Sequence, residues 1–225
     1  MRKGAGPVLI CAALGIAFLC GLGVWQVKRL AWKTSLIAQL EARMSASPVP
    51  LNYALNRMAA GEDIEYVKVS LVGEMDSQHT LFKQVPYNNS AGWEAIAPFS
   101  TDAGVSVLVD LGASDNCNHF PKSVALITGV IRLHNKGRGY FDAKNNVEKN
   151  TWFWWDLPAM KKAAQLIEPA APVIVQAFAN DSGFEASKPE IELSNNHLGY
   201  AITWFGLAAA LAGVAGAFVF GRERR

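Results

Sequence analysis

Residues 195–205, which read NNHLGYAITWF, mark the point where a polar domain gives way to a membrane helix. The chain before them is long, mixed and charged, whereas residues 198–220 carry no ionisable side chain except the phenol of Tyr200. At about 1.5 Å per residue, that apolar run rises about 34 Å, which is enough to cross a hydrocarbon core with some tilt. The sequence therefore predicts a transmembrane helix over residues 196–220.

His197 lies at the water–lipid boundary of this helix, and Tyr200 and Trp204 follow at i+3 and i+7. This spacing places the three side chains on one helical face. Neutral imidazole is an axial ligand for haem iron, and Tyr200, Trp204 and Trp25 could wall a macrocycle there. A histidine that caps the helix or meets lipid headgroups fits the same position. Taken alone, the position favours this second interpretation, because one histidine does not make a site.

The N-terminal end also reads as a membrane segment. Residues 1–4 are short and basic, and residues 5–25 are apolar and uncharged. The run is longer than a signal-peptide core and continues without a turn residue into an amphipathic helix, so we expect an uncleaved anchor. Basic residues in the tails, 1–4 and 221–225, favour the cytoplasm for both ends. Residues 26–195 would then form a periplasmic domain, on the inner (plasma) membrane of a bacterium.

Small residues recur at every fourth position in both predicted spans. Such stripes let helices approach closely, which indicates pairing of the two spans or docking against a partner's helices. Alanine and glycine that merely fill a span would give the same pattern. The stripes are Ala13, Ala17 and Gly21 in the first span and Ala209, Gly213, Ala217 and Gly221 in the second.

The middle domain changes to the period of β-strands. Residues 67–71 alternate apolar with polar side chains, as in a half-buried strand. Strands are predicted over residues 67–71, 79–85, 93–99, 105–111, 124–133 and 173–178, and short helices over residues 51–60 and 159–167. About six strands at such spacings favour an antiparallel sheet or a partly open barrel. The predicted fold class is a membrane α+β protein, in which two transmembrane helices flank a mainly antiparallel β domain with short helices.

Residues 151–160, TWFWWDLPAM, contain four consecutive aromatic side chains, which are costly to expose. They fit core and membrane-facing anchors, or a docking surface for an apolar ligand or a partner helix. Strand alternation would send Trp152 and Trp154 to one face. Phe153 and Trp155 would then face the other way, so that one pair could be buried and the other available. Trp152, Trp154 and Trp155 are the candidate docking residues.

Composition and motifs exclude several function classes. A net charge of +2 over 225 residues makes no case for nucleic acid as a partner. The sequence has no nucleophile elbow, phosphate-binding glycine loop or HExxH motif, so we predict no catalytic residue and no enzymatic activity. His79, His119 and His134 have no partner at ligand spacing and are interpreted as surface histidines. Asp110 is interpreted as a turn aspartate, and Cys117 as a free thiol.

Four separated segments resemble the surfeit locus protein 1 family, the assembly factors of haem–copper cytochrome oxidases. They occur in the family's order and extend over nearly the whole chain. They are residues 22–33 (LGVWQVKRLAWK), 127–132 (ITGVIR), 150–160 (NTWFWWDLPAM) and 195–205. Two departures stand out: residues 108–113, LVDLGA, lack the Arg and Trp that commonly follow Leu-Val-Asp, and Gly199 stands where the family usually has Gln or Glu.

The resemblance implies a membrane factor that binds haem a transiently and aids its insertion into the catalytic subunit of the oxidase. It also implies that His197 is a candidate ligand of the haem iron. The expected partners are the haem–copper oxidase catalytic subunit, a haem a synthase and membrane lipid. The alternative is a structural accessory subunit that binds no haem and stays in the mature oxidase. An enzyme acting on haem is a third hypothesis, against which the missing catalytic groups count.

Overall fold

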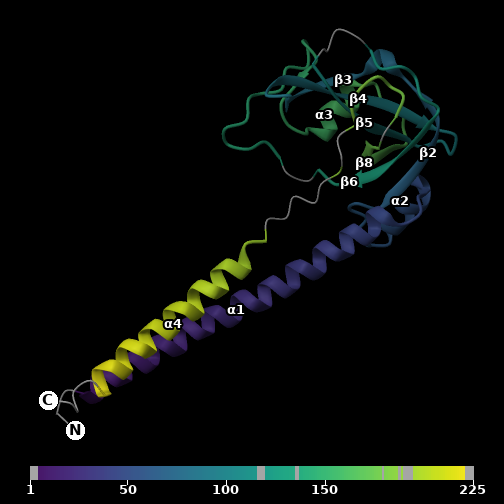
Figure 1. Ribbon diagram of the computed structural model, residues 1–225. Coiled ribbons are helices and arrows are strands. Elements are labelled where there is room, and N and C mark those ends of the chain that lie inside the picture. The colour runs from purple at the N-terminus through teal and green to yellow at the C-terminus, as the bar shows by residue number, and fades with distance from the viewer. Residues whose placement is uncertain are drawn as a thin grey trace. The chain divides into compact units, whose positions relative to one another are not determined.

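The computed structural model describes residues 5–115, 120–134, 137–178, 180–186, 189 and 195–220. The chain divides into two compact units (Figure 1). The helical unit comprises Met1–Gln39 and Ile191–Arg225, and the barrel unit comprises Leu40–Glu190. The long N-terminal helix contributes to both, because its last turns belong to the barrel unit.

Two antiparallel helices form the helical unit. α1 spans Ala5–Ser45 without a break, and α4 spans His197–Phe220. α1 thus joins the first predicted span and the amphipathic helix after it into one element, as the lack of a turn residue between them indicated. Both helices are long and apolar enough to cross a membrane. This fits a membrane protein with two spans.

The two helices lie close together at two glycines of α1. A Cβ atom at Gly23 would lie 2.7 Å from the ring of Phe205, and one at Gly15 would lie 3.0 Å from Cδ2 of Leu211. On α4, Ala201 is only 3% exposed. The contacts therefore run through small residues, which is common where membrane helices pair.

The predicted small-residue stripes do not form these contacts. The stripe on α1 is exposed, and a Cβ atom at Gly21 would meet nothing within 4 Å. The described members of the α4 stripe are exposed as well, and Gly221 lies outside the described residues. A four-residue repeat identifies one face of a helix, but packing follows the large side chains, such as Phe205, that fill a glycine gap. Docking of the stripes against a partner's helices stays a prediction.

Five strands of the barrel unit close into a barrel. Their order is β2 (Lys68–Met75), β6 (Leu126–Arg132), β8 (Ala170–Ala177), β5 (Ser106–Ser114) and β4 (Ser90–Thr101), and β4 pairs back with β2. β3 (Leu81–Tyr87) extends the sheet beyond β4, and the short strands β1 (Val49–Pro50) and β7 (Thr151–Trp152) lie at its ends. All six predicted strands are confirmed. The β1–β2, β3–β7 and β5–β8 pairs are parallel, and the other pairs of described strands are antiparallel.

The inside of the barrel is apolar, because alternate residues of each strand point to it. Closure gives each of the five strands a neighbour on both sides, so that neither edge of these strands is left unpaired. The core of the barrel unit includes Val69, Leu71, Phe99, Val109, Ile131 and Val175, each at most 1% exposed.

A second apolar cluster covers the outer face of β3, β4, β5 and β8. α3 (Leu157–Ala163) packs on it through Met160, which is fully buried. Asp156 caps this helix by accepting a hydrogen bond from the backbone N–H of Ala159. The other short helix, α2 (Leu51–Ala59), buries Leu51 and Ala54. Both predicted short helices are confirmed, and the cluster also contains Leu81, Ile96, Leu108, Trp152 and Ile174.

The four aromatic side chains after Thr151 do not alternate as predicted. β7 ends at Trp152, which is 0% exposed and belongs to the outer cluster. The chain bends after it, so Trp155 packs against the same cluster as Trp152 instead of facing away. Trp152 is therefore a core residue and not a docking residue. Trp154 and Trp155 are half-buried, and docking of a partner on them stays a prediction.

Candidate functional site

His197 is the first residue of α4, and its ring faces α1. Nδ1 of the ring lies 2.7 Å from Oε1 of Gln26. Gln26 is a polar residue in a predominantly apolar helix, yet it is only 8% exposed. Within the part of the chain that the structure describes, no hydrogen bond involves Nε2 of His197. The imidazole thus has one nitrogen held by α1 and one nitrogen left for a ligand.

Gln26 reaches His197 because the two helices are close at this level. Gly23 lies one turn before Gln26 on α1, and the ring of Phe205 fills the space that a side chain at Gly23 would occupy. The sequence reasoning missed Gln26. The available signal was a single uncharged polar side chain at the end of an apolar run, three residues after a glycine.

The other predicted haem-contacting residues differ in how far their side chains are exposed. Tyr200, one turn after His197, is 57% exposed, and Trp25, next to Gln26 on α1, is 56% exposed. Trp204 is half-buried. The aromatic rings of Tyr200 and Trp25 are therefore open to an apolar ligand, although the role of these residues around a haem stays a prediction.

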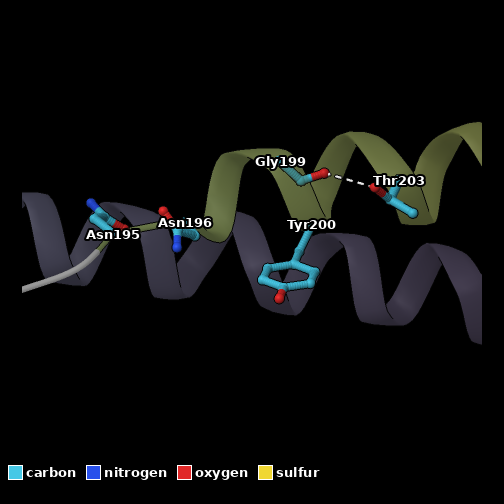
Figure 2. Close-up of a pocket in the computed structure, with 5 residues that line it drawn as sticks. All are labelled: Asn195, Asn196, Gly199, Tyr200 and Thr203. Carbon is cyan, nitrogen blue, oxygen red and sulfur yellow. Dashed lines mark hydrogen bonds between the residues drawn. The ribbon is translucent and has the colours of Figure 1, made fainter.

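An open hollow of about 510 Å³ lies at the start of α4 (Figure 2). A Cβ atom at Gly199, which lines the hollow, would meet nothing within 4 Å. The amide of Asn195 donates to Oγ1 of Thr34 at 3.4 Å. Its Oδ1 is buried and has no hydrogen-bond partner among the described residues. The hollow is lined by Asn195, Asn196, Gly199, Tyr200 and Thr203.

His197 does not line this hollow. The chemistry of the imidazole and of the exposed aromatic rings nevertheless fits an iron macrocycle. His197 offers an imidazole nitrogen that carries no other hydrogen bond, and such a nitrogen binds haem iron. The exposed rings of Tyr200 and Trp25 offer apolar contact.

A second buried polar arrangement crosses the outer face of the barrel. Lys83 of β3 donates to Glu94 of β4 at 2.7 Å, with side chains 13% and 11% exposed. Asp110 of β5 is 4% exposed and accepts a hydrogen bond from the backbone N–H of Gly112 at 2.9 Å. Burial, and then the charge of Glu94, raise the pKa of Asp110 well above its usual range. Asp110 therefore lies inside a strand, and the prediction of a turn aspartate was wrong.

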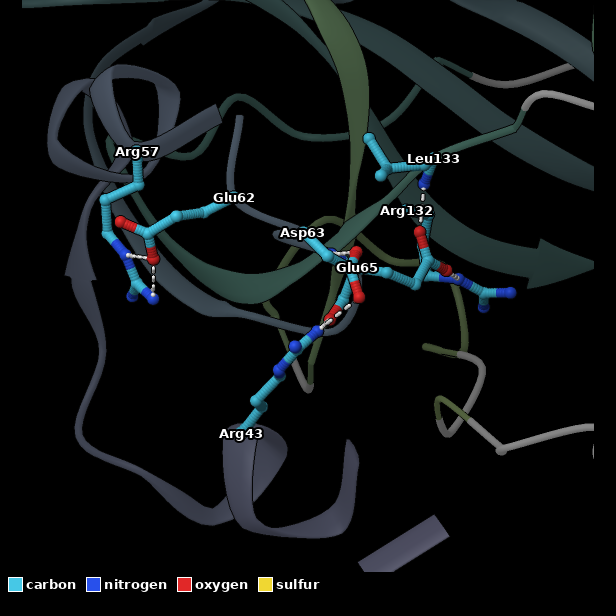
Figure 3. A network of polar contacts seen from close by, with 7 residues as sticks. All are labelled: Arg43, Arg57, Glu62, Asp63, Glu65, Arg132 and Leu133. Carbon is cyan, nitrogen blue, oxygen red and sulfur yellow. Dashed lines mark hydrogen bonds and ion pairs between the residues drawn. The ribbon is translucent and has the colours of Figure 1, made fainter. Parts of the chain in front are cut away.

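Arg132 of β6 continues this polar row. It donates to Oε1 of Gln176 at 2.8 Å and to Oε1 of Glu65 at 3.1 Å. Figure 3 shows how Glu65 and Asp63 connect Arg132 with the end of α1. There, Arg43 donates to the Asp63 carboxylate at 2.9 Å and to the backbone carbonyl of Glu65 at 3.0 Å. These contacts fasten the segment before β2 to the barrel.

His134 lies beside this row, stacked on an aromatic ring. Its ring centroid is 4.2 Å from that of Trp155, with 16° between the planes. Lys83 lies on Trp155 as well, with Nζ 4.8 Å from the ring centroid. Burial, reinforced by the charges of Arg132 and Lys83, lowers the pKa of His134 to about 4. The prediction of a surface histidine was wrong here, because Trp155 comes from a segment that the sequence pattern did not place next to His134.

Other candidate ligands do not gather into a metal site. Among the described residues, no group of three or more His, Cys, Asp and Glu side chains could hold a metal ion. His79 pairs locally, with Nδ1 2.6 Å from the carboxylate of Asp76. Cys117 and His119 lie outside the described residues.

Comparison with known proteins gives a consistent match over most of the chain. The family model described as "SURF1 family" matches residues 13–209, a range that contains both Gln26 and His197. Surfeit locus protein 1 of Gallus gallus is 32% identical over 217 residues, which cover 84% of this chain and 68% of that protein. The Homo sapiens protein of the same name is 32% identical over 224 residues, with 84% and 70% covered. A SURF1-like protein of Rickettsia felis is 28% identical over 212 residues, with 86% and 88% covered.

Proposed function

The chain belongs to the SURF1 family, and on that premise we propose that it is an assembly factor for a haem–copper terminal oxidase of the cytochrome c type. In this proposal it binds haem a transiently and aids its insertion into the catalytic subunit. The family's role in cytochrome c oxidase assembly supports the general function. The haem step rests on the residues of the helical unit.

One observation carries the haem step: the arrangement of the His197 imidazole. Its Nδ1 is held 2.7 Å from Gln26 on the neighbouring helix, while Nε2 has no partner among the described residues. A nitrogen oriented in this way, at the polar end of an apolar helix, is suited to an apolar iron complex at a membrane surface.

A single histidine also suits a carrier. Haem a is apolar and reactive, so a protein that transfers it should hold it weakly, beside the membrane, and release it by ligand exchange. One replaceable imidazole meets that requirement better than two strong axial ligands. Tyr200, Trp204 and Trp25 would contribute apolar contact around the macrocycle.

The proposed setting is the inner membrane of a bacterium, with both termini in the cytoplasm and the barrel unit in the periplasm. The basic tails support this orientation, and the match to a Rickettsia felis protein supports a bacterial setting. The proposed partners are the oxidase catalytic subunit, a haem a synthase as the source of haem a, and membrane lipid.

The test is an optical spectrum of the full chain, purified from cells that also synthesise haem a. We expect wild type to carry haem a and His197→Ala to lose most of it. His79→Ala is the matched control, since it removes another histidine from an unrelated place and should leave the haem content unchanged. Equal haem in wild type and His197→Ala would refute the ligand role.

The accessory-subunit alternative predicts a different result. A stoichiometric amount of the chain in purified, fully metallated oxidase, with no haem on the isolated chain, would favour that alternative. Absence of the chain from the purified, mature oxidase, together with haem on the isolated chain, would favour the carrier hypothesis.

A further inference from the structure

We propose that Gln26 is a positioning residue for His197, which fixes the imidazole tautomer that carries its proton on Nδ1 and thereby makes Nε2 the iron-binding nitrogen. This inference rests on the proposed function, because it concerns the same ligand site. It assigns a role to a residue that touches the histidine and need not touch the haem.

The hydrogen bond to Gln26 determines which ring nitrogen of His197 carries the proton. An amide oxygen has no hydrogen to donate, so the 2.7 Å contact between Oε1 and Nδ1 requires the proton on Nδ1. The opposite tautomer would require the Gln26 amide to turn over, so that its NH2 group donates to Nδ1, at a residue that is only 8% exposed. A buried polar atom without a partner is unfavourable, so the amide oxygen facing the ring favours the tautomer that is protonated on Nδ1. In that tautomer the lone pair of Nε2 is available, as iron binding requires.

The packing of the two helices keeps Gln26 in place beside His197. Gln26 lies one turn after Gly23, where the Phe205 ring packs directly on the backbone of α1. Neither helix can rotate freely there without losing that contact. Ligating histidines in metalloproteins commonly use such an outer partner to fix ring orientation and basicity.

The neutral charge of Gln26 sets the strength of the ligand. A carboxylate acceptor would draw the Nδ1 proton further, make the imidazole a stronger donor and favour ferric iron. An amide gives a weaker effect. A glutamine at this place therefore orients the histidine without making it hard to displace, which matches a carrier that must release its cargo.

The first test uses the haem-free full chain in detergent micelles, with ¹⁵N-labelled histidine. The imidazole ¹⁵N shifts of His197, assigned with His197→Ala, report which nitrogen bears the proton. We expect the Nδ1-protonated tautomer in wild type and in Gln26→Glu, where an acceptor remains. We expect a mixture or the other tautomer in Gln26→Leu, which has similar size but no acceptor. Gln39→Leu, an exposed glutamine on the same helix, should resemble wild type.

The second test measures haem a retention and the midpoint potential of the same variants. Loss of an outer partner typically weakens metal binding about 10–100-fold, so we expect Gln26→Leu to retain haem about that much less well. Gln26→Glu should retain it at least as well as wild type, with a lower midpoint potential. Equal potentials in wild type and Gln26→Glu would contradict the proposed tuning.

The two tests separate the two proposals. Identical tautomer populations in wild type and Gln26→Leu would overturn the role of Gln26, whatever the haem content. A tautomer that changes in Gln26→Leu, together with no haem on wild type, would overturn the proposed function and leave the positioning of the imidazole standing.

Discussion

The polar row of the barrel unit and the His197–Gln26 pair of the helical unit both bury polar side chains, but they satisfy them differently. In the barrel unit, Lys83 holds Glu94, and the carboxyl of Asp110 lies against Glu94 and a backbone N–H. In the helical unit, Gln26 holds only one nitrogen of His197. Nε2 of that ring has no partner among the described residues, and neither has the buried Oδ1 of Asn195.

This difference separates a structural network from a candidate site. Buried polar groups that bond to one another specify one arrangement of the chain and leave nothing for a ligand. A ring nitrogen without a partner, such as Nε2 of His197, has no such structural use. The barrel row should therefore matter for folding, and the helical pair for binding, which variants can test one unit at a time.

The largest effect is expected where a buried charge loses its partner. Lys83→Met keeps most of the stem volume but leaves Glu94 without its cation, next to Asp110. Breaking a buried ion pair in this way costs about 3–5 kcal/mol. Urea unfolding of the full chain in detergent, followed by circular dichroism, should show a clearly lower midpoint. Lys144→Met, at an exposed position, should unfold like wild type; equal midpoints for the two variants would contradict the importance of the row.

The next effect concerns stability in acid. The pKa of His134 is about 4 in the folded chain, below its ordinary value of 6.5. The contribution of neutral His134 to the free energy of unfolding is therefore fully present above pH 6.5. It is lost as the pH falls towards 4, by up to about 1.4 kcal/mol per pH unit. His134→Phe keeps an aromatic ring on Trp155 and removes the titration. Melting temperatures between pH 7 and 4 should fall less in this variant than in wild type, and parallel curves would exclude His134 as the cause.

Asp110 should change the pH dependence of stability in the opposite direction to His134. Its folded pKa lies above the ordinary value of 3.8, so its favourable contribution is complete below that value and is lost as the pH rises through the folded pKa. Asp110→Asn keeps an acceptor for the backbone N–H of Gly112 and gains an amide donor for Glu94. The variant should therefore gain stability relative to wild type as the pH rises from 4, by up to about 1.4 kcal/mol per pH unit. A difference that does not change with pH would show that Asp110 keeps one protonation state over this range.

The strands of the barrel could be predicted from the sequence, because alternation is a local property. Residues 67–71, for example, carry their period in five consecutive side chains, and β2 forms there. Closure could not be predicted, since it depends on the pairing of β2 with β4 far along the chain. The surroundings of Asp110 depend on that same long-range register, so a strand aspartate looked like a turn residue.

Only half of the candidate site could be predicted from the sequence, because the other half depends on a long-range contact. His197 could be singled out because it stands alone at the boundary of an apolar run. Its partner could not, because Gln26 lies at the far end of the sequence and meets His197 only when α1 and α4 pair. The helical period correctly gives the residues on one face of each helix, yet it does not say which faces meet. The small-residue stripes failed on this point, whereas Gly23, outside the stripes, makes the contact.

The smallest effects come from two glycines that differ only in what surrounds them. A Cβ atom at Gly23 would lie 2.7 Å from the Phe205 ring, whereas one at Gly199 would meet nothing within 4 Å. Gly23→Ala should therefore push the helices apart, at a cost of about 1–3 kcal/mol. Gly199→Ala should be neutral or slightly favourable, by about 0.5–1 kcal/mol, because alanine prefers the helix.

The tautomer of His197 in these two variants tests whether the close helix contact at Gly23 holds Gln26 beside His197. Separating the helices at Gly23 moves Gln26 away from His197, so the Nδ1-protonated tautomer should be lost in Gly23→Ala and kept in Gly199→Ala. Imidazole ¹⁵N shifts of the haem-free chain measure this directly, and melting temperatures measured alongside show whether each variant is folded. If Gly23→Ala is folded and keeps the wild-type tautomer, the closeness of the two helices is not what brings Gln26 to His197. The ligand geometry would then have to depend on groups other than the Gly23–Phe205 contact.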